Sequence, residues 1–136
     1  MKQGVIVIVI CMLICLTLAG CASNGEPEKI RDLEYTVQLE EDVPNKLREE
    51  IAAKKEAPFK LTYSDDDDLY IVVGYGMQLT GGYSIQVKDL YLTKNIIYCD
   101  TTLIGPQTKK EMVKAASYPV IILKTENLQD ISVVFE

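Results

Sequence analysis

The chain has 136 residues, a formal net charge of −6 and no histidine. This length suffices for one domain with a hydrophobic core and leaves little room for two. The lack of histidine excludes Ser-His-Asp and Cys-His nucleophilic sites and almost all zinc sites. The acidic balance argues against binding to nucleic acid, because phosphate groups are bound mainly by basic side chains.

The N-terminus has the pattern of a secretory signal. Lys2 precedes fourteen residues, 5–18, that are apolar except for one threonine, and this run is shorter than the roughly 20 residues of a membrane span. The sequence Leu-Ala-Gly-Cys at 18–21 resembles the lipobox of bacterial lipoproteins, in which the cysteine accepts a diacylglycerol and becomes the new first residue. We therefore predict a signal peptide over residues 1–20, lipidation of Cys21, and localisation at the cell membrane facing outside the cytoplasm. The alternative is an uncleaved anchor helix with a chance cysteine.

Cleavage after residue 20 would change both the charge and the cysteine content. It removes Lys2, so the formal charge of the mature chain becomes −7. An acidic domain is weakly repelled by an anionic membrane, so the predicted attachment depends on the lipid and not on a basic patch. With Cys21 lipidated, Cys99 is the remaining cysteine and has no partner for an intramolecular disulfide. It lies in an apolar run, and we expect it to be a small buried side chain and not a reactive thiol.

The mature chain begins with a predicted tether and a single helix. Residues 21–33 are small or charged and read as a flexible tether, and residues 34–39 alternate as a first strand. A helix is predicted over about 44–55, because Leu47 and Ile51 fall on one face and a proline suits the first turn. Pro58 marks the end of the helical region, since the residue before a proline disfavours helical geometry.

The remainder of the sequence is a succession of strands. Six runs rich in valine, isoleucine, tyrosine and threonine are bounded by turn residues, while residues 107–116 form a polar connection with room for a turn of helix. We therefore predict one mainly β domain over residues 34–136, either an antiparallel sandwich or a small barrel. The six runs are 59–63, 69–75, 83–92, 95–103, 119–125 and 130–135.

A glycine-rich loop between two of these strands is the main candidate site. It has three interpretations: a dinucleotide-binding loop, a plain strand connection that uses glycine for positive φ, or a rigid surface that offers Thr80 and Tyr83 to a protein partner. The first requires a helix immediately afterwards, whereas residues 84–88 alternate as a strand. The candidate partner-binding residues are Gly74, Tyr75, Gly76, Thr80, Gly81, Gly82 and Tyr83.

Two other patterns suggest chemistry less strongly. The four aspartates at 65–68 lack the alternation and glycine of an EF-hand, so a solvated hairpin tip is favoured over a calcium site. Ser-Lys catalysis has no lysine in an apolar setting that would lower its pKa. We accordingly predict no catalytic residue, no metal, no cofactor and no small-molecule substrate.

Three motifs carry a resemblance to a known family. Val-Val-Gly-Tyr-Gly at 72–76, Thr-Gly-Gly-Tyr-Ser-Ile at 80–85 and Ser-Tyr-Pro-Val-Ile at 117–121 resemble the C-terminal domain of the protease complex subunit PrcB family, especially its lipoprotein members from Gram-positive anaerobes. The resemblance covers roughly residues 70–135. It implies an extracytoplasmic lipoprotein that supports or stabilises a partner protease and is not itself catalytic. The residues that match are Gly74, Gly76, Thr80, Gly81, Gly82, Tyr83, Tyr118 and Pro119.

A second, fainter similarity gives an alternative function. The Thr-Gly-Gly-Tyr loop at 80–83 is similar to the Thr-Thr-Gly-Tyr loop of chagasin-type cysteine protease inhibitors, which have an immunoglobulin-like sandwich. Those inhibitors also use an Arg-Pro-aromatic element, and the only arginines here, Arg31 and Arg48, do not precede a proline. We therefore expect a non-catalytic interaction module, an accessory or stabilising subunit of a surface protease, with a chagasin-like inhibitor as the alternative.

Overall fold

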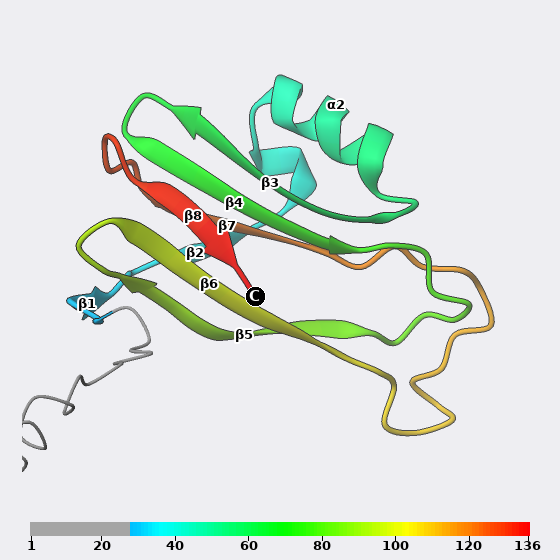
Figure 1. Ribbon diagram of the computed structural model, residues 1–136. Coiled ribbons are helices and arrows are strands. Elements are labelled where there is room, and N and C mark those ends of the chain that lie inside the picture. The colour runs from blue at the N-terminus through cyan, green and yellow to red at the C-terminus, as the bar shows by residue number, and fades with distance from the viewer. Residues whose placement is uncertain (1–27) are drawn as a thin grey trace, which may run out of the picture.

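The computed structural model describes residues 28–136, which form two β-sheets and a helix packed in three layers (Figure 1). The signal peptide, Cys21 and most of the predicted tether fall in residues 1–27, outside the described part of the chain. In chain order the elements are β1 Arg31–Asp32, β2 Thr36–Gln38, the 3-10 turn Glu40–Asp42, α2 Asn45–Lys54, β3 Pro58–Asp65, β4 Asp68–Tyr75, β5 Ser84–Leu92, β6 Ile96–Ile104, β7 Val120–Glu126 and β8 Ser132–Phe135.

Each sheet has four strands, and nearly all the pairings are antiparallel. One sheet has the order β1-β5-β6-β8 and the other the order β2-β7-β4-β3. This confirms the predicted mainly β fold and, of the two alternatives, the sandwich, because the sheets do not close into a barrel. The exception to antiparallel pairing is β8, which runs parallel to β6. After β7 the chain crosses to the other sheet, so β8 does not form a hairpin with the strand before it.

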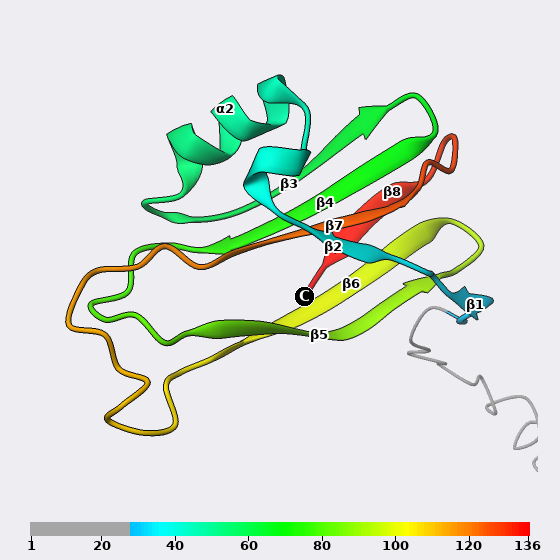
Figure 2. The ribbon, with the colours of Figure 1, turned by 180° about the vertical axis from the view of Figure 1, so that it is seen from behind.

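The main core lies between the two sheets, and β4 crosses its centre. Leu69, Ile71 and Val73 of β4 point into this core, where they meet Ile97 and Cys99 of β6. Both faces of β4 are buried, since the helix covers the opposite face of its sheet (Figure 2). Such double burial explains why this strand reads as a continuous apolar run and not as an alternating one.

Helix α2 packs through the narrow stripe that its sequence predicts. Leu47 and Ile51 are fully buried against Tyr70, Val72 and Ile122 of the sheet below. Burying one such aliphatic side chain contributes about 1.5–3 kcal/mol. Arg48 fixes the approach to the helix, because its guanidinium donates hydrogen bonds to the backbone carbonyls of residues 40 and 41.

The domain begins earlier than the predicted boundary at residue 34. Arg31 and Asp32 pair with β5, and Leu33 is only 4% exposed within the main core. The last three residues of the predicted tether therefore belong to the sandwich. A two-residue strand is too short to show a hydrophobic period, which is why the sequence gives no sign of it. No helix within residues 28–136 is long and apolar enough to span a membrane.

Candidate functional site

Two loops meet at one end of the sandwich, far from the point where the described chain begins (Figures 1 and 2). Residues 76–83 connect β4 to β5, and residues 105–119 connect β6 to β7; together we call them the loop end. Gln78 and Ser117 exchange two backbone hydrogen bonds of 2.8 and 3.0 Å. The N–H of Gly81 donates to the carbonyl of Val113 at 2.8 Å, and the hydroxyl of Ser117 donates to the carbonyl of Thr80 at 2.6 Å. The two loops therefore act as one surface.

The Gly-Gly pair allows this close approach. Gly82 has a φ of +88°, and a Cβ built there would lie 2.2 Å from the carbonyl oxygen of Glu111. A side chain at Gly81 would lie 3.0 Å from the Cβ of Val113. Any larger residue at Gly82 would be strained in its backbone and would push the loops apart. The glycine is therefore required by the junction between the loops.

The remaining glycines of the candidate site pack inside the fold. Gly74 lies within β4, where the ring of Phe59 on β3 covers the position that a side chain would take, 2.1 Å from the built Cβ. Gly76 is buried beside Pro58. These two glycines have structural roles, because both are covered by neighbouring residues.

The aromatic residues of the site are mostly turned inward. Tyr75 is half-buried, and its hydroxyl lies 2.7 Å from that of Thr101 on the opposite sheet. Tyr83 is half-buried and packs over Gly105. Thr80 is half-buried too, so the structure does not present Thr80 and Tyr83 as prominent exposed side chains.

Tyr118 and Pro119 connect the loop end to helix α2 and to strand β4. The carbonyl of Pro119 accepts a 3.0 Å hydrogen bond from the N–H of Tyr75. The ring of Tyr118 lies on the surface with the ammonium group of Lys55 5.4 Å from its centroid. This cation–π contact joins the end of helix α2 to the loop end.

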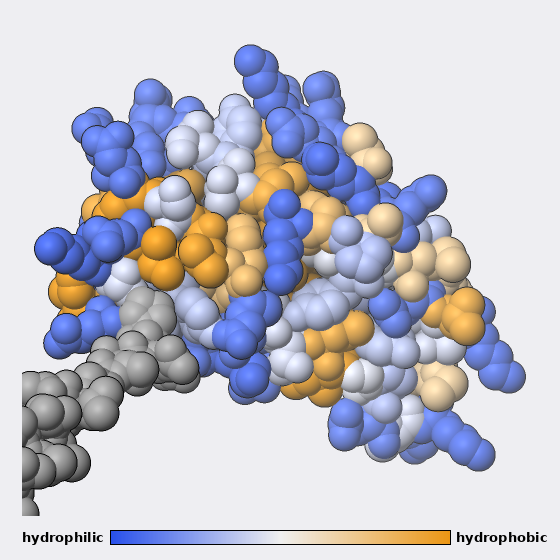
Figure 3. Space-filling model, viewed as in Figure 1, coloured by the Kyte–Doolittle hydropathy of each residue, from blue (hydrophilic) through white to orange (hydrophobic). Residues whose placement is uncertain are grey.

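The loop end exposes four apolar side chains that the sequence analysis did not single out. Leu79 is 83% exposed, Val113 58%, Met77 52% and Met112 43%. Figure 3 shows hydrophobic surface interspersed with hydrophilic side chains at this end, on the right of the view. Exposed apolar side chains gathered on rigid loops are typical of protein interaction sites. The sequence did contain one sign of this apolar surface, namely a methionine and a leucine among the glycines of residues 74–82.

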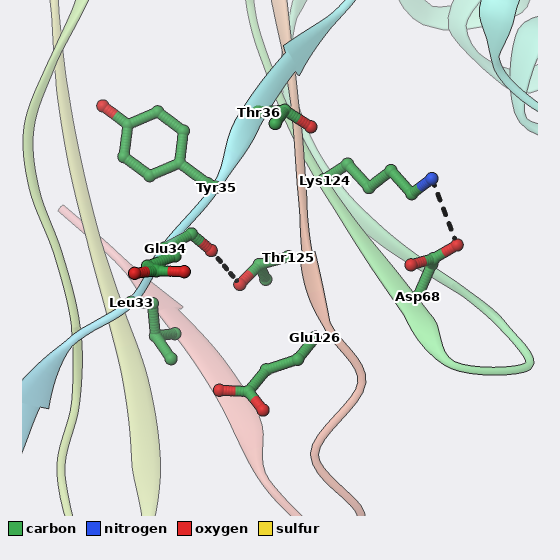
Figure 4. Close-up of a pocket in the computed structure, with 8 residues that line it drawn as sticks. All are labelled: Leu33, Glu34, Tyr35, Thr36, Asp68, Lys124, Thr125 and Glu126. Atoms are coloured by element: carbon green, nitrogen blue, oxygen red, sulfur yellow. Dashed lines mark hydrogen bonds and ion pairs between the residues drawn. The ribbon is translucent and has the colours of Figure 1, made fainter.

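A hollow lies away from the loop end, and several of its polar groups are paired with one another. It has a volume of about 740 Å³ and is lined by the β1–β2 connection, the start of β4 and the end of β7 (Figure 4). Lys124 forms an ion pair with Asp68 at 3.3 Å, and the hydroxyl of Thr125 donates to the carbonyl of Glu34 at 2.7 Å. The first contact joins β7 to β4, and the second fastens the N-terminal segment to β7. Among residues 28–136 no cluster of acidic or thiol groups is arranged to hold a metal ion.

The other residues considered from the sequence have structural positions. Asp65 and Asp68 end and begin the two strands of the β3–β4 hairpin, with Asp66 in the left-handed region at its tip, as the solvated-turn interpretation predicts. Cys99 is 1% exposed, and burial raises the pKa of its thiol to about 11. A protonated, buried thiol is a poor nucleophile, so Cys99 has a packing role in the hydrophobic core.

Comparison with known families agrees with the resemblance seen in the sequence. Residues 69–126 match the family model described as PrcB C-terminal, which confirms the predicted relationship over that segment. The match runs from β4 through β7 and therefore includes the whole loop end. Neither a curated protein nor a solved structure showed significant similarity to the chain.

Proposed function

We propose, on the premise that residues 69–126 form a PrcB C-terminal domain, that the protein is a non-catalytic accessory subunit of a surface protease. The family is one of protease complex subunits, and this supports association with such a complex. In the proposal the chain is anchored through a lipid on Cys21 and binds the protease through the loop end.

The observation that carries the proposal is the exposed apolar surface of Met77, Leu79, Met112 and Val113 on two hydrogen-bonded loops. A flexible loop loses conformational entropy when it binds, whereas loops already fixed to each other lose less. The loop end is therefore a preorganised surface whose apolar side chains would leave water on contact with a partner.

The position of the loop end suits a protein tethered at its N-terminus. Residue 28 and β1 lie at one end of the sandwich and the loop end at the other (Figure 1). A domain tethered to a membrane through Cys21 would therefore be able to extend the loop end toward proteins outside the membrane. This orientation supports binding to a neighbouring envelope protease.

Co-purification of the full-length protein from its native membranes tests the proposal. We expect a protease to co-purify with the native chain and to be lost from the double variant Leu79→Ser, Val113→Ser. The matched control is Val37→Ser, which changes a side chain of similar exposure, 61%, on β2 far from the loop end. Absence of any protease from the native sample, or retention by the double variant, would contradict the proposed function.

The chagasin-like alternative remains a second candidate, because two loops converge at one end of a β-sandwich as an inhibitor requires. It predicts that the protein at micromolar concentration slows papain and that Leu79→Ser relieves the effect. Inhibition of papain would favour this alternative, and unimpaired papain turnover would exclude it.

A further inference from the structure

We propose that the partner segment bound by the loop end is acidic as well as apolar, because the loop end is a positively charged and apolar surface on an otherwise negative protein. This inference rests on the proposed function, since it specifies the chemistry of the partner at the same surface.

The charges of the chain are distributed unevenly. Residues 105–119 contain Lys109, Lys110 and Lys114 and one acid, Glu111, which gives this segment a formal charge of +2. Residues 76–83 contain no charged side chain. Because the whole chain carries −6, the rest of it carries −8. The positive charge therefore coincides with the exposed apolar residues and not with the remainder of the molecule.

The three lysines are available to a partner. All three are exposed, and none forms an ion pair with another residue in the described part of the chain. The carboxylate of Glu111 is turned back into its own loop, where it accepts a 2.8 Å hydrogen bond from the N–H of Gln107. Lys55, which lies over Tyr118, extends the positive surface, although Glu56 beside it is an exposed acid.

The lysines and the apolar side chains belong to one surface. Met112 and Val113 lie between Lys110 and Lys114 in the sequence, and the 2.8 Å hydrogen bond from Gly81 to Val113 brings the loop that carries Leu79 beside them. A complementary segment would therefore combine carboxylates with aliphatic side chains. Positive charge at one end of a negative molecule would also orient the protein as it approaches such a segment.

The binding of designed peptides tests this chemistry directly. The full-length protein is placed in phosphatidylcholine nanodiscs and titrated with three fluorescent peptides of equal length: alternating aspartate and leucine, the same peptide with asparagine for aspartate, and the same with lysine. We expect the aspartate peptide to bind at least about tenfold more tightly than the asparagine peptide at about 0.1 M salt. The advantage should vanish near 1 M salt, where the Debye length falls from about 10 to about 3 Å.

Matched lysine variants locate the effect. The triple variant Lys109→Gln, Lys110→Gln, Lys114→Gln should remove the preference for aspartate, whereas Lys46→Gln, Lys60→Gln, Lys94→Gln removes three exposed lysines outside the loop end and should retain it. Equal binding of the aspartate and asparagine peptides, or a preference that survives the loop-end triple variant, would overturn the inference. So would lysine-dependent binding to vesicles containing phosphatidylglycerol without binding to the aspartate peptide, because the surface would then be a membrane contact.

The inference and the proposed function fail in different ways. If a protease co-purifies through Leu79 and Val113 but its capture is unchanged in the loop-end triple variant and at high salt, the inference is overturned and the proposed function stands. If no protease co-purifies while the lysine-dependent preference for the aspartate peptide is measured, the proposed function fails and the inference about the surface stands.

Discussion

The hydroxyl of Tyr75 on β4 lies 2.7 Å from the hydroxyl of Thr101 on β6, and this contact joins the two sheets directly beneath the loop end. Tyr75 is also the last residue of β4, and its N–H donates to the carbonyl of Pro119, the residue just before β7. One residue therefore ties the candidate binding surface both to its own sheet and to the opposite one. The loop end owes its fixed position to such contacts below it.

Replacing Tyr75 by phenylalanine tests this connection. Tyr75→Phe removes the hydroxyl and leaves Thr101 without this partner in a half-buried position, so we expect a loss of about 1 kcal/mol in the free energy of unfolding. Urea denaturation followed by circular dichroism measures it. Tyr35→Phe is the control, because Tyr35 is 40% exposed and its loss should stay within about 0.5 kcal/mol. Equal effects of the two substitutions would contradict a special role for the Tyr75 hydroxyl.

A substitution on the buried face of helix α2 should lower the free energy of unfolding by more than Tyr75→Phe does. Leu47 is fully buried between α2 and the sheet, so Leu47→Ala creates a cavity and should cost about 2–5 kcal/mol of unfolding free energy. The neighbouring exposed Lys46 provides the control, since Lys46→Ala should change stability by less than about 0.5 kcal/mol. Thermal unfolding of both variants measures the difference, and a small effect of Leu47→Ala would show that the helix contributes little to the domain.

The junction between the loops depends on Gly82. Gly82→Ala forces an alanine into positive φ and toward the carbonyl oxygen of Glu111, so we expect a loss of about 1–3 kcal/mol and weaker partner binding. Gly105→Ala is a sharp control in the same loop pair: its φ lies outside the left-handed region, and its new Cβ would meet Tyr83 at an ordinary 3.5 Å. Similar losses for both glycines would contradict the proposed close approach at Gly82.

The sequence predicted the elements of this fold well, because strong local patterns specify them. The helix stripe of Leu47 and Ile51 and the alternation of β3 both depend on neighbours a few residues away. The parallel placement of β8 and the docking of β1 depend on contacts between residues far apart in the chain, for which no local pattern exists.

The position of the glycine-rich loop between two strands could be read from the sequence, whereas its role as a binding site stays a prediction. Gly76, Gly81 and Gly82 fall in the loop between β4 and β5, where positive φ and close packing favour glycine, while Gly74 lies within β4. Which side chains of the loop are exposed could not be read in this way. Tyr75 is held inward by Thr101, and Val113 reaches the surface beside Leu79 through a hydrogen bond that spans 32 positions of the sequence, from Gly81 to Val113.

The buried thiol of Cys99 gives a prediction about pH. Burial raises its pKa from 9.0 to about 11, and the negative charge of Asp100 adds to the effect, so the folded protein holds a proton that the unfolded chain releases at lower pH. The stability linked to this group is therefore complete below pH 9 and is lost as the pH rises from about 9 to 11, at up to roughly 1.4 kcal/mol per pH unit. Urea denaturation at several pH values measures this slope, and Cys99→Ala, which lacks the titrating group, should show a shallower one.

The accessibility of the Cys99 thiol gives a second measurement. Because the thiol is buried, iodoacetamide at pH 8 should label the peptide containing Cys99 in urea but not in native protein, as read by mass spectrometry. Rapid labelling of the native protein, or identical slopes for both proteins, would show that this thiol is accessible and not held protonated by the core.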